Sequence, residues 1–184
     1  MAQDTGPATV SRTSFVDRMI GAAKLDSAIY REVEHDHEAN WQAVGVVLLV
    51  SLASAIGGAR HGTGGFFFGF VVALGAWLIA SGIVLFIGTK ILPEKQTEAD
   101  WGQVMRCMAF AYSPAILTIF AIIPFLSGVI FFGTWVWVII ATVIAVQEAL
   151  DYTETWRAAV VVLLGWIVFI ILRSIYLGAY HAFK

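Results

Sequence analysis

The sequence predicts an all-α integral membrane protein in which five membrane-spanning helices follow short amphipathic N-terminal helices. Of its 184 residues, 59% are hydrophobic and 13% are charged, and the mean hydropathy is +0.82. Soluble domains do not reach this composition. Several uncharged stretches are long enough as helices, at about 1.5 Å per residue, to cross a hydrocarbon core of about 30 Å. The polar N-terminal part of the chain is too charged to cross.

Glycine, proline and charged residues divide the apolar part of the chain into five stretches. A glycine-rich loop ends the first stretch at Gly58, and Lys90 and Pro93 follow the second. The uncharged run from Cys107 to Gln147 is too long for one crossing, and Pro124 supplies the residue that a helical hairpin needs. The predicted transmembrane domain covers residues 41–184, with spans at about 41–58, 66–91, 104–123, 126–146 and 157–178.

The polar N-terminal part divides into a disordered N-terminus, residues 1–12, and cytoplasmic amphipathic helices within residues 13–40. Ser14, followed three residues later by Asp17, predicts one helix start, and Asp26 predicts another as an N-cap. The helical period fits two placements equally well. The helices lie on the cytoplasmic membrane surface, or they pack against the cytoplasmic ends of the spans.

Basic residues set the expected orientation, because they concentrate in short cytoplasmic segments. A cytoplasmic N-terminus and an external C-terminus place eight basic residues inside and three outside. The inner residues are Arg12, Arg18, Lys24, Arg31, Lys90, Lys95, Arg106 and Arg157, and the outer ones are Arg60, Arg173 and Lys184.

The charged residues indicate neither catalysis nor a cofactor. No ionisable side chain lies near the centre of a span, and Arg106 is expected to reach water from a span end. The one cluster of metal-ligand types is His35-Asp36-His37-Glu38, whose histidines point in different directions on a helix, so no metal site is expected. The basic residues are scattered, which argues against nucleic acid as a partner. The single cysteine argues against redox chemistry.

Small residues follow one face of each of the first two spans. Such stripes let helix backbones approach closely. They are explained either by packing among the five helices or by a surface for a homo-oligomer or another membrane protein. The stripe residues are Ser51, Ser54, Ala55 and Gly58 in the first span, and Gly69, Ala73, Ala76 and Ala80 in the second.

A proline within the third span marks a second candidate site. Pro114 removes a backbone donor and interrupts the helix near Phe110, and Tyr112 and Ser113 place two hydroxyls beside the break. Tyr112, Ser113 and Pro114 are therefore a candidate hinge or ligand site. The alternative is a kink with a purely structural role.

Several segments of the chain resemble the Ypt/Rab-interacting-protein (Yip) domain family in its bacterial branch. They are FVDRMIGAAKLDSAIYREVE, the span that opens at Trp41, the AYSP turn of the third span and the closing ALDYTETWRAAVVVLLGW. The resemblance covers Phe15 to Leu177 and implies five spans, a cytoplasmic N-terminal region and, for a bacterial member, the plasma (inner) membrane. Eukaryotic relatives bind prenylated Rab-type GTPases and each other. Their Asp-Leu-Tyr-Gly-Pro element has no counterpart in the N-terminal part of this chain.

We therefore expect a non-enzymatic multi-pass membrane protein of the Yip type, with the lipid bilayer and other membrane proteins as its surroundings. It would organise membrane or partner proteins through helix contacts. Two alternatives stay open. One is a small-solute or lipid transporter that uses the proline-broken third span, and the other is an accessory subunit of a larger membrane complex.

Overall fold

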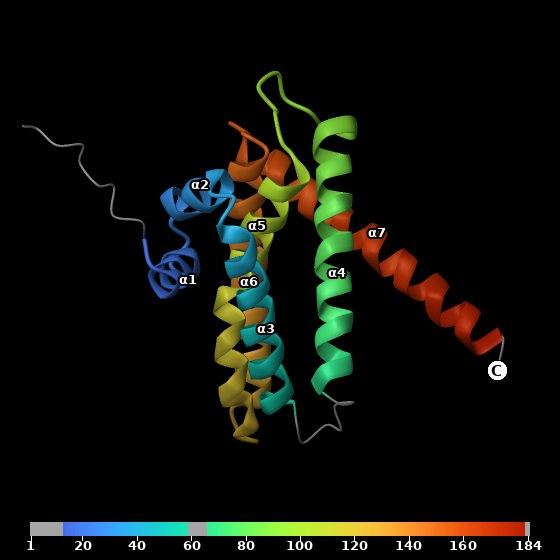
Figure 1. Ribbon diagram of the computed structural model, residues 1–184. Coiled ribbons are helices and arrows are strands. Elements are labelled where there is room, and N and C mark those ends of the chain that lie inside the picture. The colour runs from blue at the N-terminus through green and yellow to red at the C-terminus, as the bar shows by residue number, and fades with distance from the viewer. Residues whose placement is uncertain (1–12, 59–65, 183–184) are drawn as a thin grey trace, which may run out of the picture.

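The computed structural model describes residues 13–58 and 66–182, and side chains throughout these ranges except at 66–69, 172, 173 and 175–182. The prediction for residues 1–12 lies outside this part. The described chain is helical and contains no strand. Its elements are α1 (Phe15–Ala23), α2 (Ser27–His35), α3 (Ala39–Gly57), α4 (Phe66–Phe86), the π-helix η2 (Ile87–Ile91), α5 (Trp101–Ala111), the 3-10 helix η3 (Ser113–Ile122), α6 (Ser127–Ala149) and α7 (Thr155–Ala182) (Figure 1).

The two N-terminal helices begin where the sequence predicts. The Ser14 hydroxyl accepts a hydrogen bond from the Asp17 amide at 3.2 Å, and the Asp26 carboxylate accepts one from the Ala28 amide at 2.9 Å. Between them the chain turns sharply at Leu25, whose φ of 65° lies in the left-handed region. The turn places α2 beside α1.

Four helical segments of the described chain are long and apolar enough to cross a membrane. They are Ala39–Gly57, Phe70–Ile91, Trp101–Ile122 and Ser127–Ala149. The all-helical, multi-span character of the chain is thereby confirmed. Helix α7 has a shorter apolar stretch over Thr155–Ile171, so the fifth crossing stays a prediction.

The third of these segments, formed by α5 and η3, is the centre of the bundle. It is 61% buried, whereas the other three are 22–28% buried. The η3 part packs between α3 and α6, and the α5 part also contacts α2 and α4 (Figure 1). The third segment is also the least apolar of the four, with a mean hydropathy of 1.5. Protein rather than lipid therefore surrounds much of it.

Pro114 lies where this central segment changes its helical type. Helix α5 ends at Ala111, Tyr112 is its C-cap, and η3 begins at Ser113 with the proline in its first turn. Proline is accommodated there because the first amides of a helix need no intrahelical acceptor. A 3-10 helix rises about 2.0 Å per residue, so ten residues extend over roughly 20 Å rather than the roughly 15 Å of an α-helix. The change of type therefore lengthens the span.

A close approach between two spans lies at the end of α3 away from α1 and α2. A Cβ atom added to Gly57 would lie 1.9 Å from the Thr118 carbonyl oxygen, so only glycine fits there. The hydroxyls of Ser54 and Thr118 are 3.2 Å apart, within hydrogen-bond distance. Close packing of α3 on η3 thus depends on a missing side chain and a hydroxyl pair.

Helix α7 departs from the main bundle. In Figure 1 it runs diagonally behind α4, and its C-terminal part lies away from the other helices. Its contacts are with α4, η2 and α6. The helices α4 and α7 thus form a less enclosed side of the molecule.

Gly57→Ala is expected to destabilise the protein, because the new methyl group would overlap a backbone oxygen that cannot rotate away. Overpacking of this kind costs about 1–3 kcal/mol. Gly75→Ala is the matched control, since a Cβ atom added to Gly75 meets nothing within 4 Å. Thermal unfolding in detergent should show a lower Tm for Gly57→Ala only. Equal melting of both variants would contradict the close approach.

Candidate functional site

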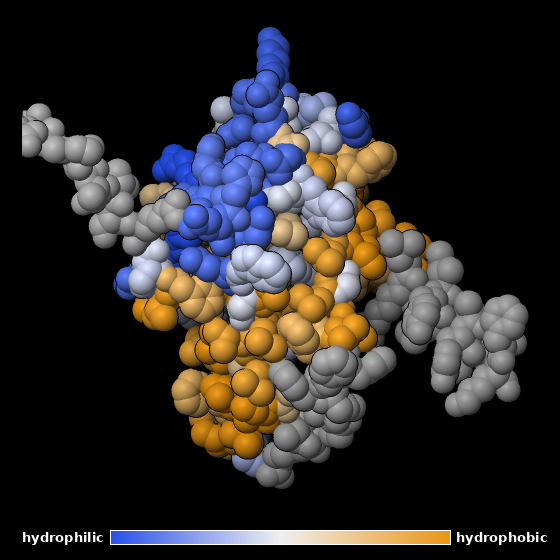
Figure 2. Space-filling model, in the orientation of Figure 1, coloured by the Kyte–Doolittle hydropathy of each residue, from blue (hydrophilic) through white to orange (hydrophobic). Residues whose placement is uncertain are grey.

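Polar side chains gather at one end of the bundle, which is here called the polar end. It consists of α1, α2, the N-terminal ends of α3 and α5, and the segments 92–100 and 150–157. Figure 2 shows hydrophilic residues over much of this end and apolar residues over the rest of the visible face. The polar end contains two buried arginine clusters and a pocket.

The first cluster joins three helices through Arg18 of α1, which is only 1% exposed. Its guanidinium donates to Glu32 of α2 at 2.8 and 3.1 Å, to Asp36 at 2.7 Å, and to Gln42 of α3 at 2.8 Å. Glu32 also accepts hydrogen bonds from the amide and the hydroxyl of Thr13. Burial alone would raise the pKa of Glu32, but these hydrogen bonds and the Arg18 charge lower it below its usual value.

The second cluster is built on Arg106 of α5, which is also 1% exposed. The guanidinium donates to the Val33 carbonyl at 2.8 Å, to the Glu34 carbonyl, and to the Asn40 side chain at 2.9 Å. The last carbonyls of a helix lack intrahelical partners and carry the negative end of the helix dipole. Arg106 therefore caps the C-terminal end of α2 and holds it against α5.

The end of α1 is held in the same way by two aromatic donors. The Tyr30 hydroxyl donates to the Ala22 carbonyl at 3.0 Å, and the Trp137 indole donates to the Ala23 carbonyl at 2.8 Å. Phe15 packs edge-on against Phe110 with 6.4 Å between the ring centroids. The two N-terminal helices are thus fixed to the spans through their C-terminal ends and through aromatic contacts.

Glu34 lies inside this arrangement without a hydrogen-bonded cation. Its side chain is 2% exposed and accepts one hydrogen bond, from Gln103 at 3.2 Å. His35 is the nearest basic side chain, at 3.8 Å. Burial, with smaller contributions from the negative charges of Asp151 and Glu148, raises the pKa of Glu34 to about 7.

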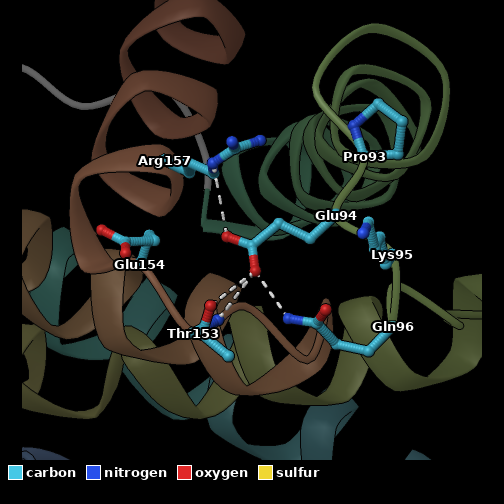
Figure 3. Close-up of a pocket in the computed structure, with 7 residues that line it drawn as sticks. All are labelled: Pro93, Glu94, Lys95, Gln96, Thr153, Glu154 and Arg157. Carbon is cyan, nitrogen blue, oxygen red and sulfur yellow. Dashed lines mark hydrogen bonds and ion pairs between the residues drawn. The ribbon is translucent and has the colours of Figure 1, made fainter.

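A pocket of about 280 Å³ lies between the segment after η2 and the start of α7. Its central residue, Glu94, accepts hydrogen bonds from the Thr153 amide at 3.1 Å, the Thr153 hydroxyl at 2.8 Å and Gln96 at 2.6 Å (Figure 3). Arg157 pairs with the other carboxylate oxygen at 3.4 Å. Burial would raise the pKa of Glu94, but the hydrogen bonds from Thr153 and Gln96 lower it, so the carboxylate stays charged.

A neighbouring tyrosine ties the pocket to η2, the helical turn that continues α4. The Tyr152 hydroxyl lies 2.9 Å from the Gly88 carbonyl and 2.7 Å from the Leu92 carbonyl, which are its acceptors. Gly88 packs closely against the Leu150 side chain, which would have to move to admit a Cβ atom at this position. These contacts fix the position of the pocket wall relative to α4.

The residues of the two predicted stripes lie in different surroundings. Ser54 contacts Thr118, and Gly58 is buried. Ala73 and Ala80 pack against the buried core. Ser51, Ala55 and Ala76 are half-buried, and Gly69 lies outside the residues with described surroundings.

The candidate hinge residues lie together at the junction of α5 and η3. Tyr112 is half-buried, whereas Ser113 and Pro114 are buried. The Ser113 hydroxyl has no hydrogen-bond partner. The junction therefore contains one unsatisfied polar group.

Sequence reasoning missed the roles of Arg106, Glu34 and Glu94. The expectation that Arg106 reaches water is wrong, because its guanidinium is enclosed against the end of α2. The available signal for the role of Arg106 was its position as a single charge among apolar neighbours in the third span. Its partners lie 66 to 73 residues away in the chain, beyond what local spacing indicates. No three histidine, cysteine, aspartate or glutamate side chains come together as a metal site in the part of the chain that the structure describes.

These features define a multi-pass helical membrane protein with a polar, N-terminal helical cap. The Yip1 domain family model matches residues 27–175, from the start of α2 into α7. The chain therefore belongs to the Yip1 domain family. No curated protein and no solved structure matches it closely.

Glu34→Gln is expected to change how stability depends on pH. The pKa of Glu34 rises from 4.5 in the unfolded chain to about 7 in the folded protein. The folded state thus binds more protons between these values, and its stability falls as pH rises through this window. The loss is on the order of 3 kcal/mol.

Thermal unfolding of the detergent-solubilised protein from pH 5 to pH 8 tests this expectation. The Tm of the native chain should fall more steeply than that of Glu34→Gln, and the variant should be the more stable of the two at pH 8. Glu98→Gln is the control, because it removes the same charge from an exposed position. Parallel Tm curves for the native chain and Glu34→Gln would contradict the assignment.

Proposed function

We propose that this protein is a non-enzymatic organiser of membrane or partner proteins, and that α1 and α2 form its partner-binding surface. The observation that carries the proposal is the attachment of both helices to the spans, by the buried Arg18 through Gln42 and by the buried Arg106 through the end of α2. Because the two helices are already fixed against the bundle, their surface does not have to become ordered when a partner binds. The association of Yip proteins with other membrane proteins supports the same role.

The outward side of α2 is the proposed contact surface. The side chains of Arg31 and His35 are 63% and 72% exposed. Arg31 approaches Glu148 of α6 at 3.6 Å, so it is oriented but remains open to solvent. A partner with acidic residues fits this surface best.

The outward side of α1 is apolar and is proposed to lie at the lipid interface. Val16 and Ile20 are exposed, whereas Arg18 and Ala22 on the other side of the helix are buried. Lys24, one turn after Ile20, is exposed and suits contact with phosphates. The sequence left open whether the helix lies on the membrane surface or packs against the spans. In this proposal α1 does both, with one side on the spans and the other on lipid.

Exposed tryptophans support the polar end as a membrane boundary. Trp41, Trp101 and Trp156 lie at or near the starts of α3, α5 and α7 and are all exposed. Aromatic residues of this kind gather at the level of lipid headgroups. The proposed orientation places this end in the cytoplasm of a bacterial cell, with α7 as the fifth crossing and an external C-terminus.

The alternative of a small-solute or lipid transporter rests on the junction of α5 and η3. The unsatisfied Ser113 hydroxyl is the observation in its favour, because a ligand with a polar group would satisfy it. Tyr112 and Pro114 would then act as a hinge. Retention of a small ligand at Tyr112 through purification would favour this function over the organising role.

A photoreactive amino acid at Arg31 is expected to cross-link to a discrete protein partner in native membranes. The same photoreactive amino acid placed at position 125 in place of Phe125, at the opposite end of the bundle, should give no such product. Arg106→Met should remove the Arg31 product, because it releases the C-terminal end of α2 from α5. Its effect on folding is checked by the Tm of the purified variant. Identical products from Arg31 and Phe125 would refute the proposed surface.

Thiol labelling in intact cells should reveal the orientation. Cysteine at Phe125 is expected to react with a membrane-impermeant reagent, and cysteine at Gln96 only after permeabilisation. Both native side chains are exposed, and the single native cysteine, Cys107, is buried, so the introduced thiols dominate the signal. The reverse pattern would place the N-terminal helices outside the cell.

A further inference from the structure

Two cavities lie along the same pair of helices. The polar pocket around Glu94 is formed by residues that follow η2 and by residues at the start of α7. A second, apolar groove of about 440 Å³ runs between α4–η2 and α7. Its lining includes Ile79, Gly82, Phe86 and Ile91 on one side, and Leu164 and Val168 on the other.

The two cavities follow one another along both walls. Ile91 in the groove precedes Pro93 in the pocket by two residues. On α7, Arg157 belongs to the pocket and Val168 to the groove. Eleven residues of helix extend over about 16 Å, close to one leaflet of a hydrocarbon core about 30 Å thick. Together the two cavities thus match one lipid in length and in polarity. The polar pocket, which would hold the headgroup, lies at the polar end of the bundle.

The charges in the pocket match a headgroup that carries both signs. Glu94 and Glu154 supply negative charge, and Lys95 and Arg157 supply positive charge. The Glu94 side chain is 8% exposed, and its Oε1 atom lacks a donor. Arg157 Nε is also buried and lacks an acceptor, although it lies 3.4 Å from that same oxygen. A bound group that has both an N–H donor and an anionic oxygen would satisfy both atoms.

The depth of the pocket agrees with the headgroup level of a bilayer. Trp156 is exposed beside the pocket, and the Arg157 guanidinium lies over its ring, 5.2 Å from the centroid. Tryptophan with a stacked arginine suits the interface between hydrocarbon and water. A free phosphate would meet Glu94 and Glu154 without a compensating amine, so a purely anionic ligand fits less well.

We propose that the pocket and the groove together bind one phospholipid whose phosphate headgroup ends in a primary amine. Arg157 and Lys95 bind the phosphate, Glu94 accepts a hydrogen bond from the ammonium group, and an acyl chain lies in the groove between α4 and α7. Phosphatidylethanolamine has this chemistry. Phosphatidylcholine lacks the N–H donor, and phosphatidylglycerol lacks the amine.

Native mass spectrometry of the full chain, titrated with these three lipids in detergent, tests the proposal. Phosphatidylethanolamine should bind about tenfold more tightly than either other lipid, as expected for one charge-assisted hydrogen bond. Equal binding of phosphatidylethanolamine and phosphatidylcholine, or stronger binding of phosphatidylglycerol, would overturn it.

Variants separate the pocket from general lipid adhesion. Arg157→Gln and Glu94→Gln should each remove the preference for the amine-bearing lipid, whereas Glu98→Gln should keep it. Gly82→Leu should fill the groove and weaken binding, whereas Gly75→Leu is the matched control, since Gly75 does not line the groove. Unchanged binding in Gly82→Leu, with its fold verified by thermal unfolding, would refute the groove as the acyl site. The lipid preference of the native chain is decisive even if a pocket variant fails to fold.

Discussion

The buried guanidinium of Arg106 fixes the polar end of this molecule. An arginine enclosed by protein needs acceptors for its donors, and here the acceptors are the last carbonyls of α2 and the Asn40 side chain. The position of α2 on α5 follows from this requirement. The position of α1 then follows from Arg18, which reaches Glu32 and Asp36 only when α2 is in place. Two charges thus determine where α1 and α2 lie.

The same arrangement explains why Glu34 retains protons near neutral pH. Arg106 directs its donors to backbone carbonyls, so the nearby carboxyl receives only the Gln103 hydrogen bond. Acidic neighbours at the end of α6 add to the cost of ionisation. The proposed contact surface on α2 therefore lies beside a buried carboxyl whose pKa is about 7.

Much of the fold could be predicted because it depends on local properties of the chain. Run lengths predicted the four long apolar segments, Ser14 and Asp26 marked helix starts, and Pro114 marked an interruption of the third span. The rotation of each helix about its axis is not a local property. Gly57, whose backbone approaches Thr118 of η3 too closely for a side chain, accordingly lies one position from the predicted stripe residue Gly58.

The candidate sites were beyond sequence reasoning for a related reason. Glu94 and Arg157 come together only because α4 and α7 cross near their polar ends. The pairing of Arg106 with α2 likewise joins segments more than sixty residues apart. In neither pair do the partners lie at a distance along the chain that corresponds to a known sequence motif. Composition correctly excluded a soluble domain, but it contained no information on which isolated charges would meet.

The low apolar content of the central segment has a consequence for how the chain enters the membrane. During synthesis each helix partitions into lipid according to its own hydropathy, and each charged residue in a span raises the cost. The segment Trp101–Ile122 contains Arg106, and its mean hydropathy is below that of its neighbours. It leaves the translocon less readily by itself than Phe70–Ile91 or Ser127–Ala149. We expect its insertion to be assisted by α3 and α4, which contact it in the folded protein.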